Sequence, residues 1–171
     1  MSNLKGQAGL SAIALRFTIL TAVRTGEAIG AMWPEFDLEN AVWTIPAVRT
    51  KTNQEHRIPL SDAAMVILKA QRKVTKEKSF VFPGPNPKKP LSNMAMLTLL
   101  RRMEVVDVTV HGFRSTFRDW VEETTEFAGS VAEAALGHVV GDKVEAAYRR
   151  GDLFEKRMAL MTAWGAFCTT N

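Results

Sequence analysis

Apolar residues dominate the stretch from residue 8 to residue 23, where almost no polar face remains. A helix that is apolar around most of its circumference is typical of a protein core. The pattern therefore predicts a buried helix over residues 8–23. Thr25 follows as a candidate cap for a second helix, with Glu27 in its first turn, and Trp33-Pro34 ends that helix.

Three short apolar stretches predict a small antiparallel sheet. They cover residues 36–38, 41–45 and 56–60, and they are separated by Glu39-Asn40 and by the polar turn 50–55. Residues 80–82 predict a further short strand. Four prolines between residues 83 and 90 predict a loop, because proline removes a backbone donor and fixes its own φ angle.

The rest of the chain predicts helices with recognisable starts. Gly137 ends one of them, so that His138 follows its last turn. The predicted helix starts are Ser61 or Asp62, Ser92, His111, a capping box at Ser130-Val131-Ala132-Glu133, Asp142 for a helix over 143–149, and Asp152-Leu153-Phe154-Glu155. The fold class predicted is α+β, mostly helical, with a three-stranded antiparallel sheet at one edge. The apolar positions of the last helix suit either the core of this molecule or a contact with a neighbouring one.

Composition restricts the possible functions only loosely. The chain has 171 residues, of which 46% are apolar, which fits one domain with a substantial core. A net charge of +4 permits a nucleic-acid partner without demanding one. The single cysteine, Cys168, rules out an intrachain disulfide and favours a reduced, cytoplasmic setting. No signal peptide or apolar run of membrane-spanning length is apparent, so no membrane partner is expected.

Six polar residues form the candidate chemistry, and each has an ordinary structural alternative. Arg24 at a helix end suits the helix dipole, Lys51 suits an exposed turn, and a His beside a Gly is common at a helix end. His111 and Arg114 are three residues apart, so they share one side of a helix at its first turn. Taken together, the candidates are Arg24, Lys51, His111, Arg114, His138 and the only tyrosine, Tyr148.

This set offers one nucleophile and five groups that can bind or protonate a phosphate. A phenol attacks poorly at neutral pH unless cations or a base help to remove its proton. Two arginines suit the oxygens of a phosphodiester, because a guanidinium donates two parallel hydrogen bonds. A histidine can transfer a proton, and a lysine can protonate a departing alkoxide. Such a scheme needs no metal or cofactor, and neither a zinc-finger spacing nor a phosphate-binding glycine loop is found.

The order of these motifs resembles the catalytic domain of tyrosine recombinases, above all phage and genomic-island integrases. The resemblance covers residues 8–168 and rests on Arg24-Thr25-Gly26-Glu27, Lys51-Thr52, residues 55–61, His111-Gly112-Phe113-Arg114, Leu136-Gly137-His138 and Ala147-Tyr148. It implies that Arg24 and Arg114 bind the scissile phosphate and that Lys51 is the general acid. It also implies that His111 and His138 assist the phosphate and proton transfer. Tyr148 would form a covalent 3′-phosphotyrosyl link to DNA, and Glu27 would support the site.

The resemblance also sets expectations for the whole protein. Residues 1–7 are expected to be a lead or linker, with the core-binding and arm-binding domains of integrases absent from this chain. Alone, such a piece is expected to be weakly active or inactive. The full-length protein is expected to act in the bacterial nucleoid, as a tetramer on double-stranded attachment sites, with accessory DNA-bending proteins. Two alternatives stay open: a type IB topoisomerase and a non-catalytic DNA-binding remnant. Arg49 stays open as an alternative to Lys51.

Overall fold

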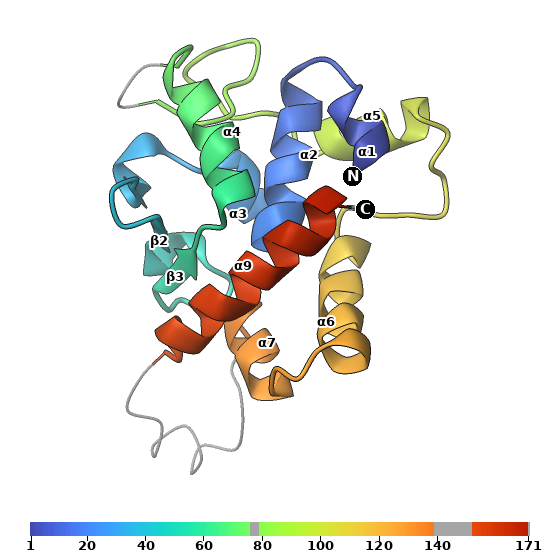
Figure 1. Cartoon of the computed structure of the whole chain (residues 1–171). Coiled ribbons are helices and arrows are strands. Elements are labelled where there is room, and N and C mark those ends of the chain that lie inside the picture. The colour runs from blue at the N-terminus through green and yellow to red at the C-terminus, as the bar shows by residue number, and fades with distance from the viewer. Residues whose placement is uncertain (76–78, 139–151, 171) are drawn as a thin grey trace.

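The computed structural model describes residues 1–75, 79–138 and 152–170. At its centre lies α2 (Leu10–Thr21), which is the predicted core helix, somewhat shorter than the pattern suggested. Helices α3, α4, α5 and α9 pack around it (Figure 1). The helix ends at Ala22, whose left-handed backbone (φ 51°) turns the chain toward Arg24. The first helix, α1 (Ser2–Lys5), packs on α2 and buries Leu4.

Six other helices and two short 3₁₀ turns complete the described helical structure. The helices are α3 (Thr25–Ile29), α4 (Asp62–Arg72), α5 (Ala95–Arg102), α6 (Gly112–Thr124), α7 (Gly129–Ala135) and α9 (Phe154–Thr170), and the turns are η1 (Trp33–Glu35) and η2 (Ala47–Arg49). The predicted helix over 143–149, with its cap Asp142, lies outside the described residues. The helices predicted before it are all present, but several of their bounds differ. Helix α3, for example, ends at Ile29, before the predicted end at Trp33-Pro34.

Three predicted helix starts were wrong. Arg24, not Thr25, is the N-cap of α3, because the Glu27 carboxylate accepts the backbone N–H of Arg24 at 2.9 Å. Helix α5 begins three residues after Ser92, whose hydroxyl accepts the backbone N–H of Met94 instead. Helix α7 begins at Gly129, so Ser130 lies inside it, and no capping box forms because the Glu133 side chain points to other partners.

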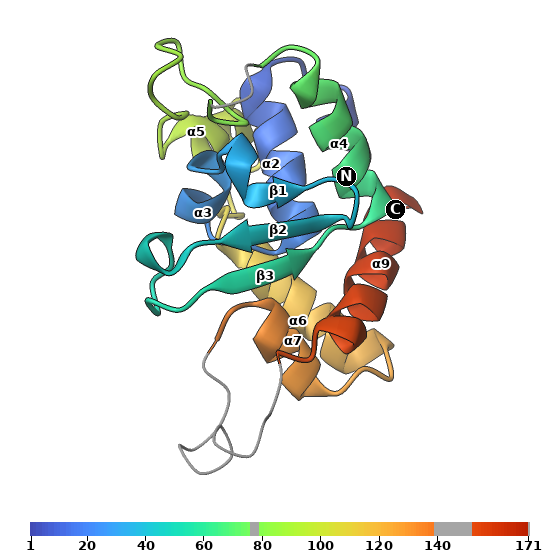
Figure 2. The ribbon, with the colours of Figure 1, turned by 90° about the vertical axis from the view of Figure 1, so that its left-hand side faces the viewer.

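The predicted sheet is confirmed. Its strands are β1 (Phe36–Asp37), β2 (Val42–Ile45) and β3 (His56–Pro59), antiparallel in the order β1-β2-β3, at one edge of the molecule (Figure 2). Trp43 pairs with both Phe36 and Ile58. Residues 80–82 do not form the further short strand that was predicted. They run beside the chain after α3, where Phe80 forms a single bridge with Met32.

Two aromatic clusters fill the core. Phe17 of α2 contacts Trp43 and Phe82, which ties the sheet and the 80–82 segment to the central helix. Phe117 of α6 meets Trp164 of α9 edge to face, and the Trp164 indole N–H donates to the Ile19 carbonyl at 2.8 Å. In the last helix, Met161 and Trp164 are buried within this molecule, whereas Met158 and Phe167 are about 40% exposed. None of the helices in the described ranges is long and apolar enough to cross a membrane.

Candidate active site

Arg114 lies at the centre of the candidate site, in the first turn of α6. Its guanidinium donates from Nη1 to the Ala22 carbonyl at 2.5 Å and from Nη2 to the Leu136 carbonyl at 2.7 Å. These carbonyls belong to the ends of α2 and α7, where backbone acceptors lack helical partners and carry partial negative charge. Arg114 is only 5% exposed, and burial lowers its pKa to about 10, with the charge of Arg24 adding to the effect. It remains a cation at neutral pH.

His138 contacts the same guanidinium. Its Nε2 lies 3.1 Å from Nη2 of Arg114, and its Nδ1 lies 2.7 Å from Oε2 of Glu133. Gly137 makes this placement possible, because its positive φ of 63° turns the chain sharply after α7. The backbone N–H of His138 then returns to the Glu133 carbonyl at 3.0 Å. The helix end that sequence analysis predicted is confirmed, and it presents the imidazole to Arg114.

Arg24 joins this group from α3. Its Nη1 pairs with Oε1 of Glu27 at 2.9 Å, and its Nη2 donates to the Gly137 carbonyl at 3.4 Å. Glu27 is almost fully buried and also accepts the Arg24 backbone N–H. The carboxylate therefore fixes Arg24 at two points and offsets part of the positive charge. Arg24, Arg114 and His138, which lie up to 114 positions apart in the sequence, share one site.

Lys51 and His111 are not drawn into these contacts. His111 directly precedes α6 and is exposed, and Lys51 is exposed in the turn that follows η2. Neither side chain makes a hydrogen bond or ion pair within the part of the chain that the structure describes. Arg49, by contrast, forms an ion pair with Glu35 and donates to the Glu27 carbonyl at 2.8 Å. Tyr148 lies outside the described residues.

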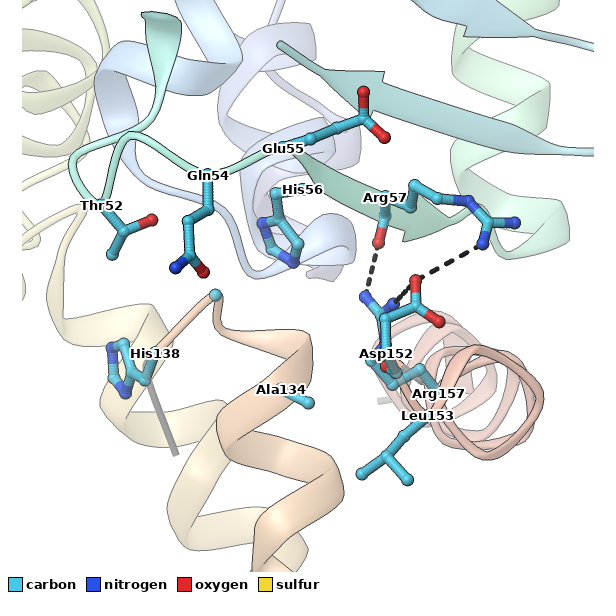
Figure 3. A pocket seen from close by; sticks show the side chains of 11 residues that line it. Thr52, Gln54, Glu55, His56, Arg57, Ala134, His138, Asp152, Leu153 and Arg157 are labelled. Atoms are coloured by element: carbon cyan, nitrogen blue, oxygen red, sulfur yellow. Dashed lines mark hydrogen bonds and ion pairs between the residues drawn. The ribbon is translucent and has the colours of Figure 1, made fainter. Parts of the chain in front are cut away.

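A pocket of about 350 Å³ opens between the β2–β3 hairpin and the end of α7 (Figure 3). Thr52, the neighbour of Lys51 in the sequence, lines one side, and His138 lines the other. At the far end, Arg157 of α9 donates to the Arg57 carbonyl and pairs with Asp152 at 2.6 Å. The hairpin that carries Lys51 therefore faces the cluster across this pocket.

His56 is a structural residue of the site that sequence analysis placed only within the predicted strand over residues 56–60. It does begin β3, but its ring lies in the pocket wall against Gly137, so closely that a Cβ on Gly137 would approach Nδ1 to 2.8 Å. Burial, with the nearby charge of Arg157, lowers the pKa of His56 from 6.5 to about 4. The ring is therefore neutral at pH 7 and acts as packing for the segment that carries His138.

Sequence analysis also missed the role of Glu133 and its partner Arg118. Glu133 was assigned to a capping box, but its Oε1 accepts from Nε of Arg118 at 2.8 Å while Oε2 faces His138. The sequence signal for this contact was that Glu133 lies five residues before His138. Whether that spacing brings the two side chains together depends on how the chain turns at the end of α7. Within the described residues, no group of three or more His, Cys, Asp or Glu side chains could hold a metal ion.

Comparisons with known proteins decide the family. Residues 2–152 match the model of the Phage integrase family. The chain belongs to this family. It is 37% identical to the prophage integrase IntA of Escherichia coli K12 over 148 residues, which cover 85% of this chain and 36% of that protein. It is 30% identical to the integrase of enterobacteria phage P4 over 179 residues, which cover 95% of this chain and 41% of that protein.

The integrase fold is confirmed by a solved structure. The integrase of mycobacterium phage Brujita superposes with a TM-score of 0.70 over 94% of this chain and 54% of that one, at 16% sequence identity. This likeness concerns the fold alone. The chain spans 36% to 41% of the two curated integrases named above, so it corresponds to part of their length. The resemblance to tyrosine recombinases expected from the sequence is thereby confirmed.

Proposed function

We propose that this integrase domain carries out the strand cleavage and joining of site-specific DNA recombination, for the integration or excision of a prophage or genomic island. The observation that supports the proposal best is the cluster of Arg24, Arg114 and His138 around one position. Two guanidiniums and an imidazole at one site suit a phosphodiester, whose negative charge increases during attack on phosphorus. The substrate is a double-stranded attachment site.

In this mechanism, Tyr148 attacks the scissile phosphate and forms a 3′-phosphotyrosyl link, while the 5′-hydroxyl leaves. Arg24 and Arg114 bind the non-bridging oxygens, and His111 assists from the start of α6. Lys51 protonates the departing oxygen. Two features support Lys51 over Arg49: its hairpin faces the pocket beside His138, and Arg49 is engaged by Glu35 and the Glu27 carbonyl. Because the phosphotyrosyl link retains the energy of the broken bond, no cofactor is needed for rejoining.

The assembly that performs recombination is also part of the proposal. Exchange between two duplexes requires several active sites, so we expect a tetramer of the full-length protein on paired attachment sites, together with DNA-bending proteins. The excess of basic residues, 22 Lys and Arg against 18 Asp and Glu, is compatible with contacts to DNA phosphates.

The test uses the full-length integrase and a nicked suicide DNA substrate that traps the covalent adduct. We expect the wild-type protein to form the adduct and Tyr148→Phe to form none, because phenylalanine has no nucleophilic oxygen. Arg24→Ala should slow adduct formation by about a hundredfold, the order expected when one group that stabilises the charged transition state is removed. Lys69→Ala is the matched control: it also removes one positive charge, but from the exposed face of α4.

Each alternative gives a different result in this test. An adduct with Tyr148→Phe would show that another residue is the nucleophile. Wild-type protein that binds DNA but forms no adduct, with binding weakened by Arg114→Ala, would indicate a non-catalytic DNA-binding remnant. Relaxation of supercoiled plasmid without strand exchange would indicate a topoisomerase.

A further inference from the structure

A continuous line of polar contacts joins the middle of α6 to its first turn by way of α7. Arg118 donates from Nε to Oε1 of Glu133 at 2.8 Å, and Oε2 of Glu133 lies 2.7 Å from Nδ1 of His138. On the other side of the ring, Nε2 lies 3.1 Å from Nη2 of Arg114. The imidazole is therefore held between a carboxylate and a guanidinium, one at each nitrogen.

The chemistry of these partners specifies where the ring proton sits. A guanidinium only donates hydrogen bonds and an ionised carboxylate only accepts them. Nε2 facing Arg114 must therefore be the accepting nitrogen, and Nδ1 facing Glu133 must carry the hydrogen. In the opposite neutral tautomer, the Nε2–H would point at an N–H of Arg114, and the bare Nδ1 would face an oxygen of Glu133, so neither contact could be a hydrogen bond. One tautomer satisfies both contacts.

We propose that Glu133 is a positioning residue that holds His138 as the Nδ1–H tautomer and so makes its Nε2 a proton acceptor. The catalytic consequence rests on the proposed function. When the phenol attacks, its O–H bond breaks, the proton passes to Nε2 and the oxygen electron pair forms the new bond to phosphorus. The bond to the 5′-oxygen breaks, and that oxygen takes its proton from the general acid. Glu133 then balances the charge of the imidazolium.

Arg114 has a second part in this scheme. Nε2 of His138 has one lone pair, and in this structure it faces an Nη2 hydrogen of Arg114. That hydrogen must therefore turn to a phosphate oxygen before Nε2 can accept the phenol proton. The other charged or titratable groups near the His138 segment are Arg24, which donates to the Gly137 carbonyl, and His56, whose ring packs on Gly137. In the described structure, neither of them reaches the imidazole nitrogens through a hydrogen bond.

Glu133 can be changed with little cost to the fold. Its side chain is 26% exposed, and its partner Arg118 is 51% exposed and also pairs with Glu122 at 3.0 Å. Exposed ion pairs of this kind contribute little to stability. Glu133 therefore allows a test of the ring proton without unfolding α7, and Glu122 offers a matched control because it contacts Arg118 but not His138.

The direct test is nitrogen NMR of this chain with ¹⁵N-labelled histidine, in which each tautomer gives a distinct pair of nitrogen shifts. Loss of one signal set in His138→Asn assigns the ring. We expect the Nδ1–H tautomer for the wild type, for Glu122→Gln and for Glu133→Gln, because an amide oxygen still accepts from Nδ1. Arg114 alone would also favour the Nδ1–H tautomer while it faces Nε2. Glu133→Ala removes the partner that holds Nδ1 and frees the ring to rotate away from Arg114, so His138 should become a mixture of both neutral tautomers. A wild-type ring with its proton on Nε2, or no change in Glu133→Ala, would overturn the proposal.

A second measurement connects the tautomer to catalysis in the full-length integrase. Glu133→Ala should slow adduct formation on the nicked substrate by about tenfold to a hundredfold, with DNA affinity unchanged, because a poorly oriented base loses part of the roughly 10²- to 10⁴-fold that general base catalysis contributes. Glu122→Gln should match the wild type. If Glu122→Gln slowed adduct formation as much as Glu133→Ala does, or if Glu133→Ala weakened DNA binding and left the rate unchanged, Glu133 would have a merely structural role. Failure of the wild type to form any adduct would refute the proposed function and leave the NMR result standing.

Discussion

Arg114 carries its charge where an unpaired cation would be costly, since it is almost fully buried. The site avoids this cost with backbone rather than carboxylate partners, because the Ala22 and Leu136 carbonyls accept two of its hydrogen bonds. A carboxylate in the same place would neutralise the guanidinium, whereas carbonyl dipoles hold it and leave its net charge available to an anion. Glu27, the deeply buried carboxylate among the described residues, is directed at Arg24.

At the same scale, His56 predicts how stability depends on pH. Its folded-state pKa of about 4 lies below the usual 6.5, so between these values the unfolded chain binds a proton that the folded chain excludes. The free energy of unfolding should therefore fall as pH drops from 6.5 to 4, by about 3 kcal/mol from this residue alone. Urea unfolding of the wild type and His56→Gln across this range measures the difference.

The comparison between these two proteins separates His56 from the carboxylates that also titrate near pH 4. His111→Gln is the control, because it makes the same substitution at an exposed histidine. Parallel profiles for the wild type and His56→Gln would show that the pKa of this ring is the same in the folded and unfolded chains, and would contradict the pKa lowering that its burial predicts.

The decisive element of the site is the end of α7. Gly137 leaves the helix with φ 63°, a conformation that costs an L-residue strain, and a Cβ there would approach Nδ1 of His56 to 2.8 Å. Gly137→Ala should lower the free energy of unfolding by about 1–3 kcal/mol and displace His138 from Arg114. Gly129→Ala, at the other end of the same helix, meets nothing within 4 Å and should be neutral or slightly stabilising. Urea unfolding of both variants tests this, and equal effects would contradict it.

The helices and strands of this protein could be predicted from its sequence better than the side-chain contacts of its site. The three short apolar segments predicted the strands of the antiparallel sheet, and the long apolar stretch predicted α2 as a buried helix, because these patterns reflect burial directly. Helix starts were less predictable, since Ser130 matched a capping pattern while Glu133 bonded elsewhere. The grouping of polar residues was expected from the resemblance, but the carbonyl partners of Arg114 and the packing of His56 depend on tertiary contacts that no local pattern encodes.

In the whole molecule, α9 joins the parts that carry the site. It packs on α2, α4, α7 and β3, and it crosses α4 closely, since a Cβ on Gly165 would lie 2.6 Å from the Ser61 side chain. Near its start, the buried Arg157 bonds to the Arg57 carbonyl of β3. The strand that carries His56 and the helix that presents His138 are therefore both braced by the last helix (Figure 1).

This arrangement predicts that α9 unfolds together with the site. Trp164 is 2% exposed and donates to the Ile19 carbonyl, so Trp164→Ala should lower the free energy of unfolding by about 3–5 kcal/mol, as for other buried aromatic residues. Met158→Ala, at a 42% exposed position of the same helix, should change it by about 0.5 kcal/mol or less. Far-UV circular dichroism and tryptophan fluorescence should give coincident urea transitions. Removing so deeply packed a side chain from an integral helix should cost far more than about 1 kcal/mol. If Trp164→Ala lowered the free energy of unfolding by less than about 1 kcal/mol, or if the two transitions separated, α9 would not be an integral part of this domain.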